Sequence, residues 1–349
     1  MRYFTIIIIL LFAFSPLHAQ TSTWEPMNRG LGHTLVYNLA IDPVDSLRMF
    51  CGTDAGQVYE SVDGAFNWQL RSSGLPTTFG GERVSGLYQD PNNREQLLAG
   101  YSGRQSEQML YSSSDGGASW KLIPTPSTWK SGGILHLHRT QENPPRIYCG
   151  LGWWKGLHRT SDNGQTWTAL LTDAAIQTIG VHPARLDVML VGCSGRQTLL
   201  RTSNAGATWA EATTGFGKRD AGTGVRAITF SPHSPDVVYI GVTGTGAGLY
   251  RSQNAGLSWT QLNGIGEISE IAVHPQNENL IYISAIGSGV LRSTNGGVAW
   301  TPINNGLPTT DVMRVRIAPG YPVCVFAVTL KHGAFRMVDE ELKEDLFVK

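Results

Sequence analysis

The octet TSDNGQTW, residues 160–167, recurs with substitutions six times along a chain of 349 residues. Each copy ends in a tryptophan, and the copies end at Trp68, Trp120, Trp167, Trp209, Trp259 and Trp300. Consecutive tryptophans of this set are 41 to 52 residues apart. A period of this length fits a repeating unit of four short β-strands.

The segments around each octet predict those four strands. In the fourth repeat, residues 178–183, 187–193 and 199–202 form three apolar runs before the octet, and Trp209 opens a fourth run after it. Such runs are short, rich in β-branched residues and bounded by Gly, Pro, Asn or Asp. Each period therefore predicts one antiparallel four-stranded sheet.

The two ends of the chain together predict a seventh unit. Residues 312–337 contain three strand-like segments but no octet and no tryptophan. Near the N-terminus, residues 24–31 (WEPMNRGL) match residues 300–307 (TPINNGL after Trp300). An N-terminal strand that completes the last unit leaves the ring without an open edge. We therefore expect an all-β, seven-bladed β-propeller of four-stranded antiparallel blades, with the last blade closed by the N-terminal strand.

Composition and the N-terminal residues predict an exported protein. The formal net charge is zero and only 15% of residues are charged, so no basic field favours nucleic acid. Arg2, the apolar run 4–14 and the sequence Leu17-His18-Ala19 are typical of a signal peptide. No second apolar run is long enough to span a bilayer, so we expect no membrane insertion. We predict a signal peptide at 1–19, the propeller at 20–338, a charged tail at 339–349, and a secreted or periplasmic location.

The sequence contains no motif for a metal or a cofactor. Its four cysteines, Cys51, Cys149, Cys193 and Cys324, fall in predicted strands of different repeats. Export permits disulfides, so buried thiols and one or two bridges both stay open. No Cys-x-x-Cys or Cys/His cluster indicates a metal site, and we expect no cofactor.

The octet resembles the Asp-box, or BNR repeat, of sialidases, xyloglucanases, sortilin-type receptors and photosystem II assembly factors. The residues at its third position are Asp63, Asp115, Asp162, Asn204, Asn254 and Asn295. A short acceptor side chain there folds back onto backbone N–H groups of its own turn, which Asn does as well as Asp. The resemblance implies that these six residues are structural and lie on the face opposite the ligand site.

The residues favour a binding scaffold over an enzyme. A sialidase needs three arginines that converge on a carboxylate. The recurring arginines of this chain instead share one register at the end of the third strand, beside the octets, and we expect them to support turns or bridge blades. They are Arg159, Arg201, Arg251, Arg292 and Arg336. Xyloglucanase-like enzymes use two propellers, and only one is predicted here. A glycoside hydrolase of xyloglucanase-like or sialidase-like type is the alternative function.

The loops predicted on the face opposite the octets carry unusual residues. Exposed aromatic rings beside cations suit recognition, and we expect the binding surface to comprise Arg104, Trp129, Lys130, Trp153, Trp154, Lys155 and Arg196. The expected partner is a protein or a glycan. A tryptophan that folds down to fill its own loop is the alternative, and the oligomeric state stays open.

The innermost strands align on the proline turns that end them. Five residues before the proline, or at the matching apolar register, stand Asn38, Gly86, His136, Thr178, Ala227, Glu270 and Arg314. We expect these residues near the central channel. Glu270 and Arg314 come from neighbouring blades, which predicts an ion pair.

Overall fold

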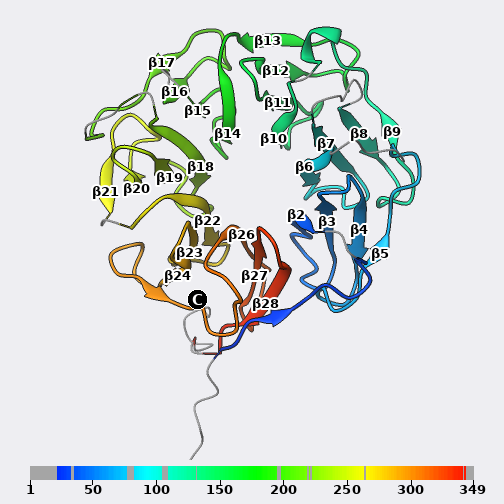
Figure 1. Cartoon of the computed structure of the whole chain (residues 1–349). Coiled ribbons are helices and arrows are strands. Elements are labelled where there is room, and N and C mark those ends of the chain that lie inside the picture. Colours follow the sequence, from blue (N-terminus) through cyan, green and yellow to red (C-terminus); the bar gives the residue numbers. More distant parts are fainter. Residues whose placement is uncertain are drawn as a thin grey trace, which may run out of the picture.

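Twenty-eight short strands form seven four-stranded antiparallel sheets arranged around a central axis (Figure 1). The computed structural model describes residues 22–32, 35–76, 82–103, 109–130, 132–194, 198–217, 220, 222–262, 265–340 and 342. The predicted seven-bladed propeller is confirmed. The predicted signal peptide lies outside the described residues.

The strands of each blade follow one another outward from the axis. The innermost strands are β2 (Val36–Ile41), β6 (Arg83–Gln89), β10 (Ile134–Arg139), β14 (Ala175–Val181), β18 (Gly224–Phe230), β22 (Ile268–His274) and β26 (Val312–Ile317). The second strands are β3 (Met49–Thr53), β7 (Leu97–Ser102), β11 (Ile147–Leu151), β15 (Met189–Ser194), β19 (Val238–Thr243), β23 (Asn277–Ala285) and β27 (Cys324–Thr329). The third strands are β4 (Val58–Ser61), β8 (Leu110–Ser113), β12 (Gly156–Thr160), β16 (Leu199–Thr202), β20 (Gly248–Ser252), β24 (Gly289–Ser293) and β28 (Gly333–Val338).

The outermost strands are shorter than the others. They are β5 (Gln69–Leu70), β9 (Lys121–Leu122), β13 (Thr168–Leu171), β17 (Ala210–Glu211), β21 (Thr260–Leu262), β25 (Thr301–Pro302) and β1 (Glu25–Pro26). One short 3-10 helix, η1 (Ser127–Trp129), lies between the second and third blades. Because strand direction alternates within a blade, the octets and the turns after the innermost strands share one face, which we call the octet face. The hairpins between second and third strands and the connections between blades share the opposite face, the loop face.

The N-terminal strand closes the ring as predicted. In β1, Glu25 pairs with Arg336 and Pro26 with Phe335 of β28. Trp24 is 2% exposed, and its indole donates to the carbonyl of Ile303 in the preceding blade. The last blade is therefore assembled from both ends of the chain.

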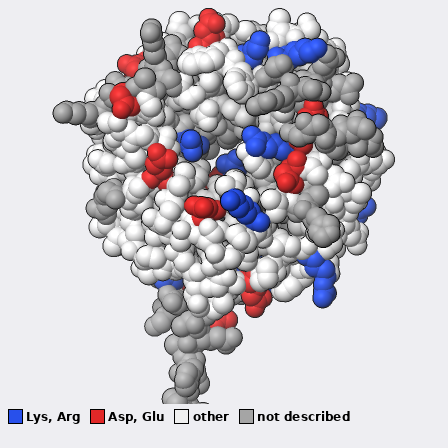
Figure 2. All heavy atoms as spheres, in the orientation of Figure 1, with Lys and Arg blue, Asp and Glu red and all other residues white. Residues whose placement is uncertain are grey.

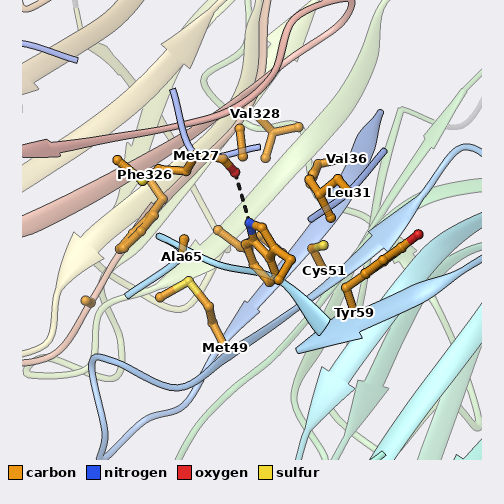
Figure 3. Close-up of a cluster of buried hydrophobic side chains, with 13 residues drawn as sticks. Met27, Leu31, Val36, Met49, Cys51, Tyr59, Ala65, Phe326 and Val328 are labelled. Carbon is orange, nitrogen blue, oxygen red and sulfur yellow. Dashed lines mark hydrogen bonds between the residues drawn. The ribbon is translucent and has the colours of Figure 1, made fainter. Parts of the chain in front are cut away.

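Indole groups join neighbouring blades around the ring. Trp68 Nε1 donates to the carbonyl of Met27 at 2.9 Å, and Trp120 Nε1 donates to that of Arg71 at 2.8 Å. Figure 3 shows the first of these bonds inside a buried cluster that joins the N-terminal segment, β27 and the first blade. Neighbouring blades also approach each other closely where a glycine lies on the second strand. A Cβ on Gly150, for example, would lie only 2.6 Å from Ile176 of the next blade.

The octets form compact turns held by their own side chains. Thr160 Oγ1 donates to Asp162 Oδ1 at 2.6 Å, and the N–H of Thr166 donates to the same oxygen at 2.9 Å. Asn204 accepts equivalent bonds, at 2.8 Å from Thr202 Oγ1 and at 2.9 Å from the N–H of Thr208. This geometry explains physically why both Asp and Asn occur at the third position.

Four of the five recurring arginines contact the next blade, in line with the expectation, whereas Arg251 stacks on Tyr239 of its own blade. Arg201 Nε donates to the carbonyl of Ala255 in the next octet at 2.9 Å, and Arg159 Nη1 donates to that of Ala205 at 3.4 Å. The Arg336 guanidinium lies 5.0 Å from the ring of Phe66 in the first octet. These arginines therefore support the octet face and do not converge on a ligand.

The expected boundary at residue 338 is wrong. Asp339 is 1% exposed, accepts a bond from Tyr282 Oη at 2.6 Å and pairs with Arg292 Nη1 at 2.5 Å. Leu342 is 4% exposed and packs in the core of the last blades. Two residues of the expected charged tail thus belong to the propeller. In several other blades the equivalent arginine contacts the octet of the next blade, and since the last blade has no octet, Asp339 accepts this contact from Arg292 instead.

The cysteines form no disulfide in the described part of the chain. Cys51, Cys149 and Cys193 are buried free thiols on the second strands of three blades, and Cys324 is a partly buried free thiol. Burial raises the pKa of Cys193 to about 12. Such thiols behave as small apolar core residues.

Removal of the closing strand tests the ring closure. Deleting residues 22–31 removes the β1–β28 ladder and the Trp24 indole bond, and it leaves β28 as an open edge. We expect a lower midpoint of thermal unfolding and concentration-dependent association. A truncated chain that unfolds like the parent and stays dispersed would show that the closing strand is dispensable.

Two variants of one octet separate packing from turn capping. Trp120 is 4% exposed, so Trp120→Ala should cost about 3–5 kcal/mol of unfolding free energy in denaturant titrations. Asp115→Asn should cost much less at neutral pH, because three octets already carry Asn. Equal losses in the two variants would contradict this division of roles.

The pH dependence of unfolding tests the capping bonds of Asp115. Hydrogen bonds from the Ser119 side chain, then its backbone and Ser113, lower the pKa of Asp115 to about 2. Because the pKa of Asp115 is lower in the folded chain than in the unfolded chain, ionised Asp115 stabilises the fold at pH values above the ordinary aspartate pKa. This stabilisation is lost as the pH falls through about 2. We expect Asp115→Asn to show a shallower loss of stability between about pH 4 and pH 2, measured against the parent chain at each pH.

Candidate functional site

A ring of seven residues lines the mouth of the channel on the loop face. Each innermost strand has an irregular register at one residue near its start, and the residues at this point are Tyr37, Ser85, Leu135, Gln177, Arg226, Ser269 and Met313. They line a cavity of about 450 Å³ together with Ile286, Asp311, Val312, Arg314 and Leu330. Figure 2 shows a hollow at the centre of the molecule, with basic and acidic side chains around it. The volume suits a small ligand or part of a larger one.

The next residue of each innermost strand forms the ring that the sequence predicted. The residues pair in equivalent registers with the second strands, as His136 does with Gly150 and Arg314 with Val328. Glu270 Oε2 lies 3.6 Å from Arg314 Nη1, and Glu270 Oε1 also contacts Arg316. The predicted ion pair between the sixth and seventh blades is therefore confirmed, and a second arginine shares the carboxylate.

Two histidines of β10 add neutral groups to the channel. Burial lowers the pKa of His136 to about 3, with smaller contributions from His138 and the two channel arginines. Burial also lowers the pKa of His138 to about 4. Both imidazoles are therefore uncharged at neutral pH, and each offers one donor and one acceptor.

The described residues that line the cavity do not include the carboxylate pair that glycoside hydrolysis requires. Asp311 is the only acid among the described residues that line it. Glu270, deeper in the channel, is paired with Arg314 and Arg316, and it is not among the described residues that line the cavity. No group of three or more His, Cys, Asp or Glu among the described residues is placed to hold a metal.

Trp153 and Trp154 form the tip of the hairpin between β11 and β12. They are 74% and 54% exposed. Their φ angles are 52° and 61°, and the N–H of Lys155 donates to the carbonyl of Gly152 at 3.1 Å. Two positive φ angles inside a four-residue turn define a type I′ turn, whose usual central residues are Asn and Gly. Both tryptophans are thus exposed at a turn that disfavours them.

The connection into the third blade lies beside this turn, as predicted. The N–H of Gly152 donates to the carbonyl of Gly133 at 3.1 Å. A Cβ on Gly132 would lie 2.8 Å from Cγ of Lys155, so the stem of Lys155 runs along this connection. Lys130 is exposed on the same connection. Arg104 and Arg196, the flanking members of the expected surface, lie outside the described residues.

Trp129 does not belong to the surface where we expected it. Its side chain is 1% exposed, and its ring centroid lies 4.7 Å from that of His158 and 4.6 Å from that of Trp167. Helix η1 turns the ring inward, into the apolar core between the second and third blades. A sequence signal existed, because an apolar residue such as Leu31 or Leu75 follows most outer strands and is buried.

The sequence did not predict two further apolar residues at the mouth. Ile286 and Leu330 are 42% and 48% exposed and line the cavity. They occupy the hairpins between second and third strands of the sixth and seventh blades. In the sequence they look like ends of apolar strands, so only the position of the turn separates them from core residues.

Comparisons with known proteins support the fold. No family model matches the chain. A xyloglucanase from Paenibacillus sp is 24% identical over 203 residues, which cover 45% of this chain and 20% of that protein. The chain thus aligns with about a fifth of the length of this curated relative. In the described residues, no helix has the length and apolar character needed to cross a membrane.

Solved structures extend the similarity to almost the whole propeller. YCF48 bound to D1 peptide superposes with a TM-score of 0.64 at 15% identity, covering 90% of this chain and 96% of that chain. The GH74 enzyme of Niastella koreensis superposes with a TM-score of 0.51 at 17% identity, covering 86% of this chain and 56% of that chain. The chain is a seven-bladed β-propeller whose structural neighbours include GH74 and YCF48 propellers.

Proposed function

We propose that this chain is an exported binding scaffold that takes a protein partner on its loop face. The observation that carries the proposal is the pair of exposed tryptophans in a left-handed turn. Trp153 and Trp154 provide rigid aromatic area, and Lys155 and Lys130 provide positive charge beside them. Export and a secreted or periplasmic location rest on the signal-peptide pattern of residues 1–19.

The backbone of the turn supports recognition over packing. A left-handed conformation costs an ordinary residue about 1–2 kcal/mol, and bulky residues rarely adopt it. Exposed indoles recover little of this free energy from burial. Strained and exposed aromatic residues occur typically at functional sites. The turn therefore presents two hydrophobic anchors to a partner at some cost in stability.

The octet face has a different role in this proposal. Its aspartates and asparagines cap their own turns, and we propose that they are structural, in line with the resemblance to Asp-box propellers. The YCF48 structure contains a bound D1 peptide, which makes a protein segment a reasonable ligand for a propeller of this type. We propose that the partner of this chain, whatever its sequence, binds at the tryptophan turn.

Glycan binding is the second candidate. Adjacent exposed tryptophans also suit stacking on sugar rings, and the curated relative is a xyloglucanase. Hydrolysis is less favoured, because Asp311 has no second carboxylate among the described residues that line the cavity. A glycan array probed with the parent chain and a tryptophan variant distinguishes a glycan from a protein ligand.

Replacing the tryptophan pair by the residues that a type I′ turn prefers gives a sharp test. The double variant Trp153→Asn, Trp154→Gly should raise the free energy of unfolding by about 1–2 kcal/mol, because it relieves the left-handed strain. It should also weaken partner binding by at least about 2 kcal/mol, as loss of aromatic hot spots does. Denaturant unfolding and retention of partners from the native extracellular fraction measure the two effects.

Two controls keep the test interpretable. Trp153→Ala, Trp154→Ala removes the rings but keeps the left-handed backbone, so it should lose binding without the gain in stability. Val62→Ala removes an apolar side chain that is 62% exposed on the octet face and should retain all partners. Lower stability of the Asn-Gly variant would indicate a packing role, and unchanged partner retention would remove this turn from the binding surface.

A further inference from the structure

Two arginines, one of them without an ion pair among the described residues, line the mouth of the channel. Arg226 and Arg314 both line the cavity of about 450 Å³, and Asp311 is the only acid among the described lining residues. Arg226 is exposed and forms no hydrogen bond or ion pair in the described part of the chain. It extends from the fifth blade, and Arg314 extends from the seventh, with Ser269 of the sixth blade between them.

Arg314 is only partly neutralised. Its Nη1 lies 3.6 Å from Glu270 Oε2, beyond hydrogen-bonding distance, whereas Arg316 makes the closer contact with that carboxylate. Arg314 Nε and Glu270 Oε2 are buried without hydrogen-bond partners, whereas the Arg314 side chain as a whole is 27% exposed, so its exposed end is the part that a ligand can reach. A guanidinium has five donors in a planar fork that matches a carboxylate. The mouth therefore holds hydrogen-bonding capacity that the described residues do not use.

Apolar side chains line the same cavity. Leu135, Val312 and Met313 line it, and the exposed residues Ile286 and Leu330 stand at its rim. The ring of Tyr37 also lines the cavity, and the Arg83 guanidinium stacks on it at 4.5 Å from the centroid. Cationic groups from the fifth and seventh blades and apolar groups from the third, sixth and seventh blades thus line one open cavity.

We propose that the channel mouth binds a carboxylate that adjoins an aliphatic group, with the carboxylate on Arg226 and Arg314 and the aliphatic group against Met313, Ile286 and Leu330. A carboxylate accepts charge-assisted bonds from both guanidinium groups. Three arginines, Arg226, Arg314 and Arg316, face two carboxylates, Asp311 and Glu270, at the mouth and in the channel, so the net charge of these groups is positive. The ligand is a small free acid or the end of a peptide, since both present this chemistry.

This site goes beyond the proposed function, because it needs no contribution from the tryptophan turn. The Asn-Gly variant of Trp153 and Trp154 separates the two proposals. If this variant loses its partners but still binds the carboxylate, the two sites are independent and the mouth site is supported. If the chain binds no carboxylate but the variant loses its partners, only the tryptophan turn is supported.

Calorimetric titration of the purified chain with 4-methylpentanoate tests the proposal. We expect saturable binding in the millimolar range, and binding at least about tenfold weaker for 4-methylpentanamide, which keeps the shape and lacks the charge. Acetate, which lacks the aliphatic group, should also bind at least about tenfold more weakly. The tripeptide Gly-Gly-Leu with a free or an amidated C-terminus distinguishes the two ligand sources: binding of the free form extends the site to peptide ends, and its absence restricts the site to small acids.

Variants of the mouth locate the bound carboxylate. Arg226→Gln and Arg314→Gln should each weaken binding of 4-methylpentanoate at least about tenfold, whereas Asp311→Asn should strengthen it by removing a like charge. Arg146→Gln, on the octet face, is the matched control and should bind as the parent does. Arg226 is exposed, so its variant reports on binding even if Arg314→Gln destabilises the fold. Absence of saturable binding, equal binding of the amide, or binding unaffected in Arg226→Gln would overturn the proposal.

Discussion

An indole N–H at the start of an outer strand reaches back to a backbone carbonyl of the preceding blade at six of the seven blades, the exception being Trp300, which donates to Gly297 of its own octet. Trp68 donates to Met27, Trp120 to Arg71, and Trp24 to Ile303 across the point where the chain closes. A single four-stranded sheet cannot bury both of its faces, so each blade depends on its neighbours for a core. The N-terminal strand matters for the same reason, because without it the last blade would offer an unpaired edge.

Closure of the ring fixes where function can reside. The octet face is occupied by turns that satisfy their own polar groups and by arginines such as Arg201 that reach the next blade. The loop face carries no such repeated turn, and its hairpins and connections differ in sequence from blade to blade. It therefore tolerates two exposed tryptophans in a strained turn and a channel mouth with unsatisfied guanidinium groups. Both candidate sites lie on this face.

Repetition made most of the fold predictable. Six octets and one matching N-terminal segment were enough to predict seven blades, the closing strand and the pairing of Glu270 with Arg314. Departures from the repeat were harder. Trp129 looked like a surface residue because it stands next to Lys130 in a predicted loop, yet a 3-10 turn directs it into the core. The left-handed angles of Trp153 and Trp154 belong to a tight hairpin, the irregular register at Arg226 arises from pairing with β19, and Asp339 is buried by contacts with the sixth blade; the sequence pattern predicted none of these.

Photo-crosslinking from single positions on the two faces tests most directly the claim that the loop face binds the partner. A benzoylphenylalanine at position 154, in the tryptophan turn, is compared with one at position 62, which is exposed on the octet face. Both full-length variants are irradiated in the organism that makes the protein, and the crosslinked products are identified by mass spectrometry. We predict a discrete crosslinked partner from position 154 and none from position 62. A partner crosslinked from position 62 alone would contradict the account.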